Sequence, residues 1–311
     1  MKLFVPGGAG FIGSAFVGHA VSRGHEVTVL DALTYRGRRD NLDGVDHAFV
    51  QADIIDAEAL DEHLPGHDAV VNFANGSFVD RSIQNPEEFV FTNSLGTARL
   101  VEAVRRHQVP RMLHVSTDEV YGSIDPPGAF RTTHPLDPSS PYSATKAAAD
   151  VYCLASYKTF RTPVLIARMC NIFGPRQHPE NLIPRFVTNL LRGEPVGLYG
   201  DGRNVREWLH VDPACDGLLR VLDAGTTGEV YHLGSGVEKD NLTIAHRLAE
   251  LTGADRGLIT FVDDRLGHDR RYRLDLSRTV EELGWKAASD FDSQLADTVE
   301  WYRSNRDWWE S

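Results

Sequence analysis

Cysteine is scarce in this chain of 311 residues, and the spacing of the cysteines argues against both a disulfide-bonded domain and a zinc-binding domain. The three cysteines, Cys153, Cys170 and Cys215, stand far apart and form no Cys-x-x-Cys pair. An odd number at such spacing argues against a disulfide framework and against a zinc site, and it fits a reducing compartment. We therefore expect no bound metal and a cytoplasmic location.

Long apolar runs are absent as well. No run approaches the ~20 residues that a helix needs to cross a bilayer. Residues 1–5 lead directly into Pro6, Gly7 and Gly8, which leaves no room for the apolar core of a signal peptide. We expect no membrane association.

Positive charge is the third deficit, because 32 Lys and Arg residues face 44 Asp and Glu residues, for a formal net charge of −12. A protein that binds nucleic acid non-specifically needs a basic surface, so we expect no nucleic-acid partner. A small anionic substrate stays open, since a few local arginines can bind a diphosphate inside an acidic protein.

The first half of the chain alternates short apolar runs with amphipathic stretches, which predicts a Rossmann-type, doubly wound parallel α/β sheet. After about Gly174 the alternation loosens. We predict a larger domain over residues 1–174 and a smaller C-terminal lobe mainly over 175–311, with the chain crossing between them more than once. The candidate strands are 3–5, 26–30, 47–52, 69–73, 111–116 and 163–168, and the candidate helices are 15–23, 57–63, 86–107 and 142–160.

A glycine-rich segment, Gly7-Gly8-Ala9-Gly10-Phe11-Ile12-Gly13, follows the first candidate strand and precedes a helix. Glycines at this spacing allow a tight turn and a close approach of the backbone to a pyrophosphate. The helix N-terminus then supplies N–H donors to the phosphates. We expect a dinucleotide to bind here, at Gly7, Gly10, Phe11, Ile12 and Gly13.

Asp31 ends the second candidate strand, 18 residues beyond Gly13. An acid at this place binds the adenosine ribose hydroxyls and repels a 2′-phosphate, which favours NAD over NADP. Arg36, Arg38 and Arg39 follow closely and are suited to a 2′-phosphate instead. The alternative role for Asp31 is a helix cap or loop acid. Asp53 and Ile54 close the third strand, where Asp53 either contacts the adenine or caps the next helix.

Tyr142 and Lys146 open a candidate helix and lie one turn apart on one of its faces. An ammonium beside a phenol favours the phenolate, so we expect Lys146 to lower the pKa of Tyr142 toward working pH. Tyr142 then acts as a general base on an alcohol whose carbon loses a hydride. In an arbitrary helix the same two residues would be surface neighbours; behind a dinucleotide motif they indicate catalysis.

With these motifs the chain resembles the extended short-chain dehydrogenase/reductase family and, within it, the dTDP-glucose 4,6-dehydratases. The resemblance covers nearly the whole chain, and its most specific element is Thr117-Asp118-Glu119. The related 4-epimerases and decarboxylases usually have small hydroxyl residues where Asp118 and Glu119 stand. The other shared motifs are Asp-Ala-Leu-Thr-Tyr (31–35), Val-Asp-Arg-Ser-Ile (79–83), Ser-Ser-Pro-Tyr-Ser-Ala-Thr-Lys (139–146), Tyr-Gly-Asp-Gly-Arg-Asn-Val-Arg-Glu-Trp (199–208) and Gly-His-Asp-Arg-Arg-Tyr (267–272).

The resemblance implies bound NAD in the first domain and a nucleotide-diphosphate hexose held mainly by the second lobe. It implies that Glu119 is the base at C5, Asp118 the acid at C6, and Thr117 a hydrogen-bond partner of the C4 oxygen beside Tyr142. Two carboxylates in one pocket must differ in protonation, so Asp118 needs a raised pKa. Their alternative role is a helix cap. By the same resemblance Ala74 contacts the cofactor, and Ser77, Asn171, Arg206, Asn241 and Arg265 bind the substrate.

The chain departs from the family pattern beside the sugar. The family usually reads His-x-Ala-Ala-Glu-Ser-His-Val-Asp after the fourth strand, and here Asn72, Asn75, Gly76 and Phe78 replace four of those residues. Asn181 stands where the family usually has Lys. These changes leave the nucleotide and the sugar undetermined.

The leading hypothesis is therefore an NAD-dependent nucleotide-sugar 4,6-dehydratase, a lyase of deoxysugar biosynthesis. The first alternative is a nucleotide-sugar 4-epimerase, which needs only Tyr142, Lys146 and NAD. The second is a non-catalytic protein that binds NAD or a nucleotide sugar. Residues 86–107 and 142–160 carry apolar side chains on more than one face, so we also expect a homodimer joined by a four-helix interface.

Overall fold

The protein, described here as a computed structural model over residues 1–288 and 290–310, is built around a seven-stranded sheet. Every pair of neighbouring strands is parallel, and the order is β10-β6-β5-β4-β1-β2-β3. The six predicted strands are confirmed to within two residues at each end. The strands are β1 (Lys2–Pro6), β2 (Glu26–Leu30), β3 (Ala48–Val50), β4 (Ala69–Asn72), β5 (Met112–Thr117), β6 (Val164–Met169) and β10 (Val230–Leu233).

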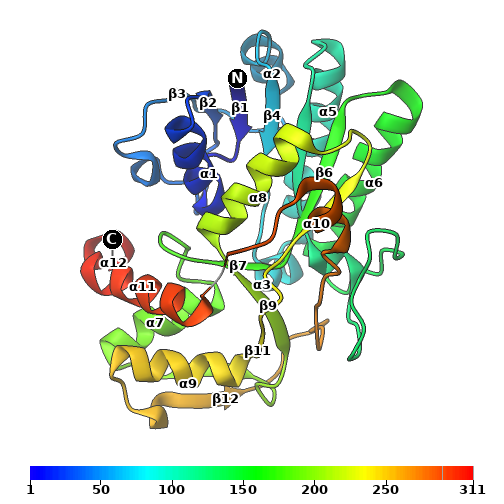
Figure 1. Cartoon of the computed structure of the whole chain (residues 1–311). Helices are drawn as coiled ribbons and strands as arrows, with labels where there is room; N and C mark the ends of the chain where they lie inside the picture. The colour runs from blue at the N-terminus through cyan, green and yellow to red at the C-terminus, as the bar shows by residue number, and fades with distance from the viewer. Residues whose placement is uncertain (289, 311) are drawn as a thin grey trace.

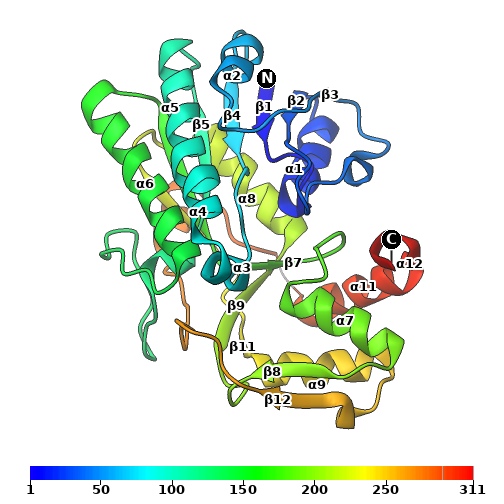
Figure 2. The ribbon, with the colours of Figure 1, turned by 180° about the vertical axis from the view of Figure 1, so that it is seen from behind.

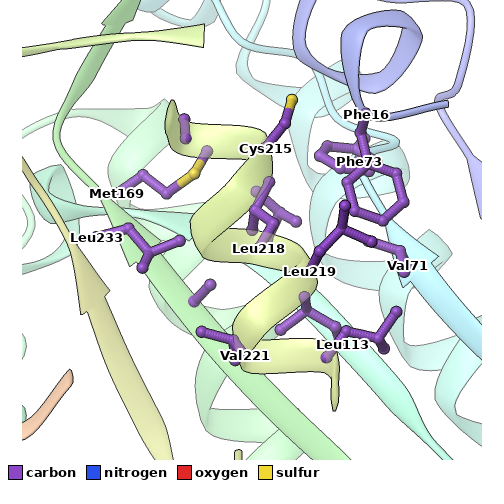
Figure 3. Packing of buried hydrophobic residues seen from close by; sticks show 14 of the residues in the cluster. Phe16, Val71, Phe73, Leu113, Met169, Cys215, Leu218, Leu219, Val221 and Leu233 are labelled. Atoms are coloured by element: carbon purple, nitrogen blue, oxygen red, sulfur yellow. The ribbon is translucent and has the colours of Figure 1, made fainter. Parts of the chain in front are cut away.

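Helices cover both faces of this sheet, as apolar strands buried on both sides require. One face carries α1 (Phe11–Ser22) and α8 (Val211–Ala224) (Figure 1). The other carries α2 (Ala57–His63), α5 (Thr97–Arg106) and α6 (Pro141–Phe160) (Figure 2). Figure 3 shows the core beneath α8, where Leu218 and Leu219 lie among side chains of the sheet and of α1.

The stretch predicted as one helix over residues 86–107 is three segments. They are α4 (Pro86–Phe89), a π-helix η2 (Val90–Gly96) and α5. A π-helical turn widens the helix locally and is common at functional sites. Here it points Asn93 inward, where the side chain is 1% exposed.

The smaller lobe has two short sheets and a core of its own. One sheet contains β7 (Asn171–Phe173), β9 (Val205–His210) and β11 (Glu238–Asp240), and the other pairs β8 (Val196–Tyr199) with β12 (Ile259–Val262). Around them lie α7 (Leu182–Arg192), α9 (Asn241–Thr252), α11 (Phe291–Ser304) and α12 (Arg306–Glu310). Trp208, Trp301, Trp308 and Trp309 all pack in or against this core.

Residues 211–233 return from the smaller lobe to the larger sheet, where they form α8 and the edge strand β10. We keep the division after residue 174 as a proposal, with this crossing included. Among the described residues no helix has the length and apolarity to span a bilayer. The remaining elements are α3 (Val79–Gln84), α10 (Ser277–Leu283), η1 (Arg39–Leu42), η3 (Asp118–Tyr121) and η4 (Arg256–Leu258).

Candidate active site

A single long cavity opens where the parallel strands end, and it runs from the glycine loop to the carboxylate pair. The ends of five strands and the first turns of α1 and α6 line it. The residues expected from the sequence that line it are Gly7, Gly10, Phe11, Ile12, Gly13, Asp31, Asp53, Ile54, Ala74, Ser77, Thr117, Asp118, Glu119, Tyr142, Lys146 and Asn171.

In the glycine loop, a side chain at Gly7 or Gly13 would collide with neighbouring backbone atoms. Gly7 has φ +77°, a conformation that favours glycine. A Cβ on Gly13 would press on the carbonyl oxygen of Gly7 and lie 2.9 Å from the Cα of Gly8. The loop therefore presents bare backbone at the start of α1, which fits a pyrophosphate.

The carboxylate of Asp31 accepts hydrogen bonds of 2.9 Å from the backbone N–H groups of Ala9 and Leu33. It thus also acts as a loop acid that fixes the glycine segment. Burial raises its pKa, and these two bonds oppose the rise. The cap of α2 is Asp56, which accepts from Glu58 and Ala59, so the capping alternative for Asp53 is wrong.

Tyr142 and Lys146 lie in the first turns of α6, which begins with a capping box between Ser140 and Ser143. Ser82 fixes the entry of this helix, since its hydroxyl accepts from the backbone N–H of Tyr142 at 3.1 Å. The Lys146 ammonium donates to the carbonyl of Val115 at 2.8 Å. The start of α6 is therefore tied to β5, the strand that directly precedes the two carboxylates.

The expected lowering of the Tyr142 pKa is wrong for the protein alone. Burial raises that pKa well above its usual value, and Glu119 and Asp118 act in the same direction. A hydrogen bond with Thr117 and the charge of Arg36 oppose the rise. The physical reason is the burial of the phenol, to which the two nearby carboxylates add; the hydrogen bond of the Lys146 ammonium goes to the carbonyl of Val115.

Asp118 and Glu119 begin the short helix η3 at the end of β5. Thr117 caps it by accepting from the backbone N–H of Glu119 at 3.2 Å, so the carboxylates are not the cap. Burial raises both pKa values, that of Asp118 most strongly because Glu119 and Glu207 add to it. Arg265 and Arg206 oppose the rise at Glu119.

Asn93 is a site residue that the sequence reading missed. Its amide oxygen accepts from the N–H of Gly76 at 2.7 Å, and its amide nitrogen donates to the Gly76 carbonyl and to the Thr145 hydroxyl. It thereby joins the altered loop after β4 to the catalytic helix. The π-helical turn that positions Asn93 leaves no pattern in apolar periodicity, so sequence periodicity alone does not reveal it.

Arg206, Asn241 and Arg265 do not line the main cavity. Arg206 is 5% exposed, donates to the carbonyls of Val205 and Asp269, and lies over the ring of Tyr272. Buried polar atoms without a partner among the described residues occur on Asn171 (Oδ1), Asn241 (Oδ1), Arg265 (NH1) and Asp118 (Oδ2).

Two of the positions that depart from the family pattern, Asn75 and Gly76, line the cavity. Arg36 donates to the Ser77 hydroxyl at 2.6 Å and to Glu180 at 2.9 Å, and its guanidinium lies 5.2 Å from the Phe78 ring centre. Asn181 also lines the cavity. Side chains of the cofactor-binding loop thus contact the loop before α7.

Comparisons with known proteins agree with this geometry. Residues 4–298 match the family model of GDP-mannose 4,6 dehydratase. A dTDP-glucose 4,6-dehydratase of Actinoplanes sp. is 48% identical over 99% of this chain and 100% of its own length. The structure of the Streptomyces venezuelae dTDP-glucose 4,6-dehydratase DesIV, with NAD and TYD bound, has 49% identity, a TM-score of 0.97 and coverage of 100% of this chain and 99% of that one. A UDP-glucose 4-epimerase of Thermotoga maritima reaches a TM-score of 0.93 at 29% identity, covering 98% and 100% of the two chains.

The glycine loop generates a direct prediction. Gly13→Ala should abolish retention of NAD while leaving the fold intact, because the added methyl group collides with the backbone of Gly7 and Gly8. Gly18→Ala on the same helix is the matched control, since a Cβ there meets nothing within 4 Å. The NAD content of the purified variants, read by absorbance after denaturation, measures the effect. Equal NAD content in the two variants would contradict the assignment of the loop.

Proposed function

Because the chain belongs to the family of the dTDP-glucose and GDP-mannose 4,6-dehydratases, we propose that it dehydrates dTDP-glucose to a dTDP-4-keto-6-deoxy sugar. One observation supports this most strongly: Tyr142 and Lys146 line the same cavity as Asp118 and Glu119. The first pair suffices for oxidation at C4, as in an epimerase, whereas the carboxylate pair is needed only to remove water across C5 and C6.

The cofactor is NAD, which when bound accepts the hydride from C4 and returns it to C6. The glycine loop and Asp31 hold its phosphates and adenosine ribose. Ala74, in the loop anchored by Asn93, would contact the cofactor when it is bound. The walls of the cavity, from Gly7 to Tyr142, fit a dinucleotide laid along the strand ends.

The proton transfers belong to the side chains. Tyr142 takes the proton of the C4 hydroxyl while Thr117 donates to the same oxygen. The C4 carbonyl makes the C5 hydrogen acidic, and Glu119 removes it. Asp118, kept protonated by burial and by its neighbouring carboxylates, gives its proton to the C6 oxygen, which leaves as water. Glu119 then returns the proton to C5 as the hydride arrives at C6.

The nucleotide is held beyond the carboxylates. Arg206 and Arg265 both act on the charge of Glu119, so they lie near enough to meet a diphosphate attached to the sugar. The unpartnered amide oxygens of Asn171 and Asn241 are available to the sugar or the nucleotide. Ser77 contacts the sugar from the loop after β4.

A panel of nucleotide hexoses tests the proposed function. With dTDP-glucose, and less with UDP-glucose or GDP-mannose, mass spectrometry should show loss of one water and alkali should develop the absorbance of a keto sugar. An isomer of unchanged mass would support the 4-epimerase alternative instead. Binding without turnover for every donor would support the non-catalytic one.

Substitution of the carboxylates should separate the two half-reactions. Glu119→Gln should lower kcat by about 10²–10⁴-fold and let NADH and the 4-keto hexose accumulate, because C4 oxidation continues without removal of the C5 proton. Asp118→Asn should continue to exchange C5 hydrogen with deuterium while water leaves slowly. Tyr142→Phe should form no NADH. Stopped-flow absorbance and mass spectrometry measure these outcomes.

Glu194→Gln, at an exposed turn after α7, is the control and should keep wild-type turnover. Near-normal dehydration by both carboxylate variants would refute the roles given to Asp118 and Glu119.

We also propose a cytoplasmic homodimer. All three cysteines are free thiols, which fits a reducing compartment. Of the apolar residues that suggested the interface, Phe89, Leu100 and Val104 are buried within the subunit. An exposed apolar face nevertheless runs over η2 and α6, and its residues are Val90, Phe91, Leu95, Val151, Tyr152 and Phe160.

Val151→Asp should weaken the dimer by about 100-fold or more, because the new carboxylate would be buried between subunits without a partner. Val280→Asp on α10 is the matched control, since Val280 is 41% exposed and Val151 is 56% exposed. Sedimentation equilibrium measures both. Dimerisation unchanged in Val151→Asp would place the interface elsewhere.

A further inference from the structure

A cluster of buried charged side chains lies behind the catalytic helix, and the mechanism above does not use it. Asp150 on α6 is fully buried and Arg168 on β6 is 2% exposed. Arg168 donates through Nε to Asp150 at 2.7 Å. Asp150 follows Lys146, itself 3% exposed, by four residues on the same helix. A buried carboxylate therefore lies one turn behind the catalytic ammonium.

The arginine is anchored toward the carboxylate segment. It donates to the hydroxyl of Tyr121, the last residue of η3. His232 places its Nδ1 at 3.0 Å from the carbonyl of Asp275, so Nδ1 carries the proton and Nε2 is an acceptor. Tyr121 donates to that Nε2 at 2.7 Å. In the chain of hydrogen bonds from Arg168 through Tyr121 and His232 to Asp275, each donor therefore has an acceptor.

The other side of Asp150 is less well compensated. Its Oδ1 has no hydrogen-bond partner among the described residues, and Nε2 of His114 lies 3.6 Å away. Asn72 orients this ring, because its oxygen accepts from the N–H of Ala74 and its nitrogen donates to Nδ1 of His114. The proton of His114 is therefore on Nε2 and faces Asp150. Burial lowers the pKa of His114, which keeps it neutral.

We propose that Asp150 and Arg168 are positioning residues for the reaction: the carboxylate holds the side chain of Lys146 as an ammonium behind Tyr142, and the arginine limits how strongly it does so. Two buried cations, Lys146 and Arg168, share the charge of Asp150. Loss of the anion therefore destabilises the ammonium, whereas loss of the arginine leaves the anion to Lys146 alone. This inference rests on the proposed function, since it concerns the same tyrosine and lysine.

The electrostatics of Lys146 agree with this arrangement. Burial lowers its pKa to about 8, and Asp150 is the foremost group that opposes the fall. The other titratable neighbours are neutral near pH 7: burial raises the pKa of the Cys153 thiol on α6 and lowers that of His114 on β5. Burial also raises the pKa of Tyr142, one turn earlier on the helix.

The pH dependence of C4 oxidation tests the proposal. In the wild-type holoenzyme with dTDP-glucose, the rate of NADH formation should fall as pH rises through the Lys146 pKa of about 8. Asp150→Asn should move this alkaline limb down by about one pH unit, and Arg168→Gln should move it up by a similar amount. The double variant should return close to the wild-type limb, because both charges are gone. Arg278→Gln, which removes an arginine paired with Glu229, should leave the limb unmoved.

Nuclear magnetic resonance of ¹³C-labelled lysine provides a second readout that needs no turnover. The Lys146 signal, assigned with Lys146→Arg, should titrate in the same order in the variants, while exposed Lys158 on the same helix stays constant. If Asp150→Asn does not fold, Arg168→Gln and the double variant still carry the test. The proposal would be overturned if neither the alkaline limb of the pH–rate profile nor the Lys146 titration moved in any folded variant. If the wild-type protein shows no turnover but the Lys146 titration shifts as expected in the variants, the proposed function is refuted and the roles of Asp150 and Arg168 are not.

Discussion

Parallel pairing of the strands is the constraint on which the whole site depends. Because every strand of the large sheet runs the same way, the chain leaves β1, β2, β4 and β5 at one edge. The ends of these four neighbouring strands therefore bring the glycine loop, Asp31, the loop after Ala74 and the Asp118–Glu119 pair to one cavity. Tyr142 and Lys146 reach the same edge because α6 begins there. Residues more than a hundred positions apart thus line one cavity.

Burial gives this centre its electrostatic character. Desolvation is the first cause of the raised pKa values of Asp118, Glu119 and Tyr142. What separates the two carboxylates is their surroundings. Glu119 meets Arg265 and Arg206, whereas Asp118 meets Glu119 and Glu207 before it meets Arg206. The acid and the base of the proposed mechanism are thus neighbouring residues of one short helix whose charged surroundings differ.

Local patterns predicted the strands, the glycine loop and the Tyr142–Lys146 pair because each depends on residues close in sequence. The edge strand β10 was missed, since its place in the sheet depends on a chain crossing that no local pattern records. Asn93 was missed because a π-helical turn aims it inward. The pKa of Tyr142 was predicted in the wrong direction, because burial raises it and the carboxylates of η3 act in the same direction, and the spacing between Tyr142 and Lys146 reveals neither effect. The motifs predict roles for individual residues, whereas the electrostatic environment of each residue can be described only from the tertiary structure.

The altered loop after β4 shows how the chain changes its sugar-facing wall without changing the catalytic groups. Both backbone polar groups of Gly76 bond to Asn93, and a Cβ at this position would lie 3.1 Å from the Phe89 ring. That ring in turn meets Tyr142 edge-on at 6.4 Å between centres. A side chain at position 76 would therefore require the Phe89 ring to shift by a few tenths of an ångström. Glycine at 76 thus lets this loop pack closely against Phe89. The loop residues that line the cavity at this point are Asn75, Gly76 and Ser77, so under the proposed function the sugar meets an amide and a hydroxyl here in place of the glutamate.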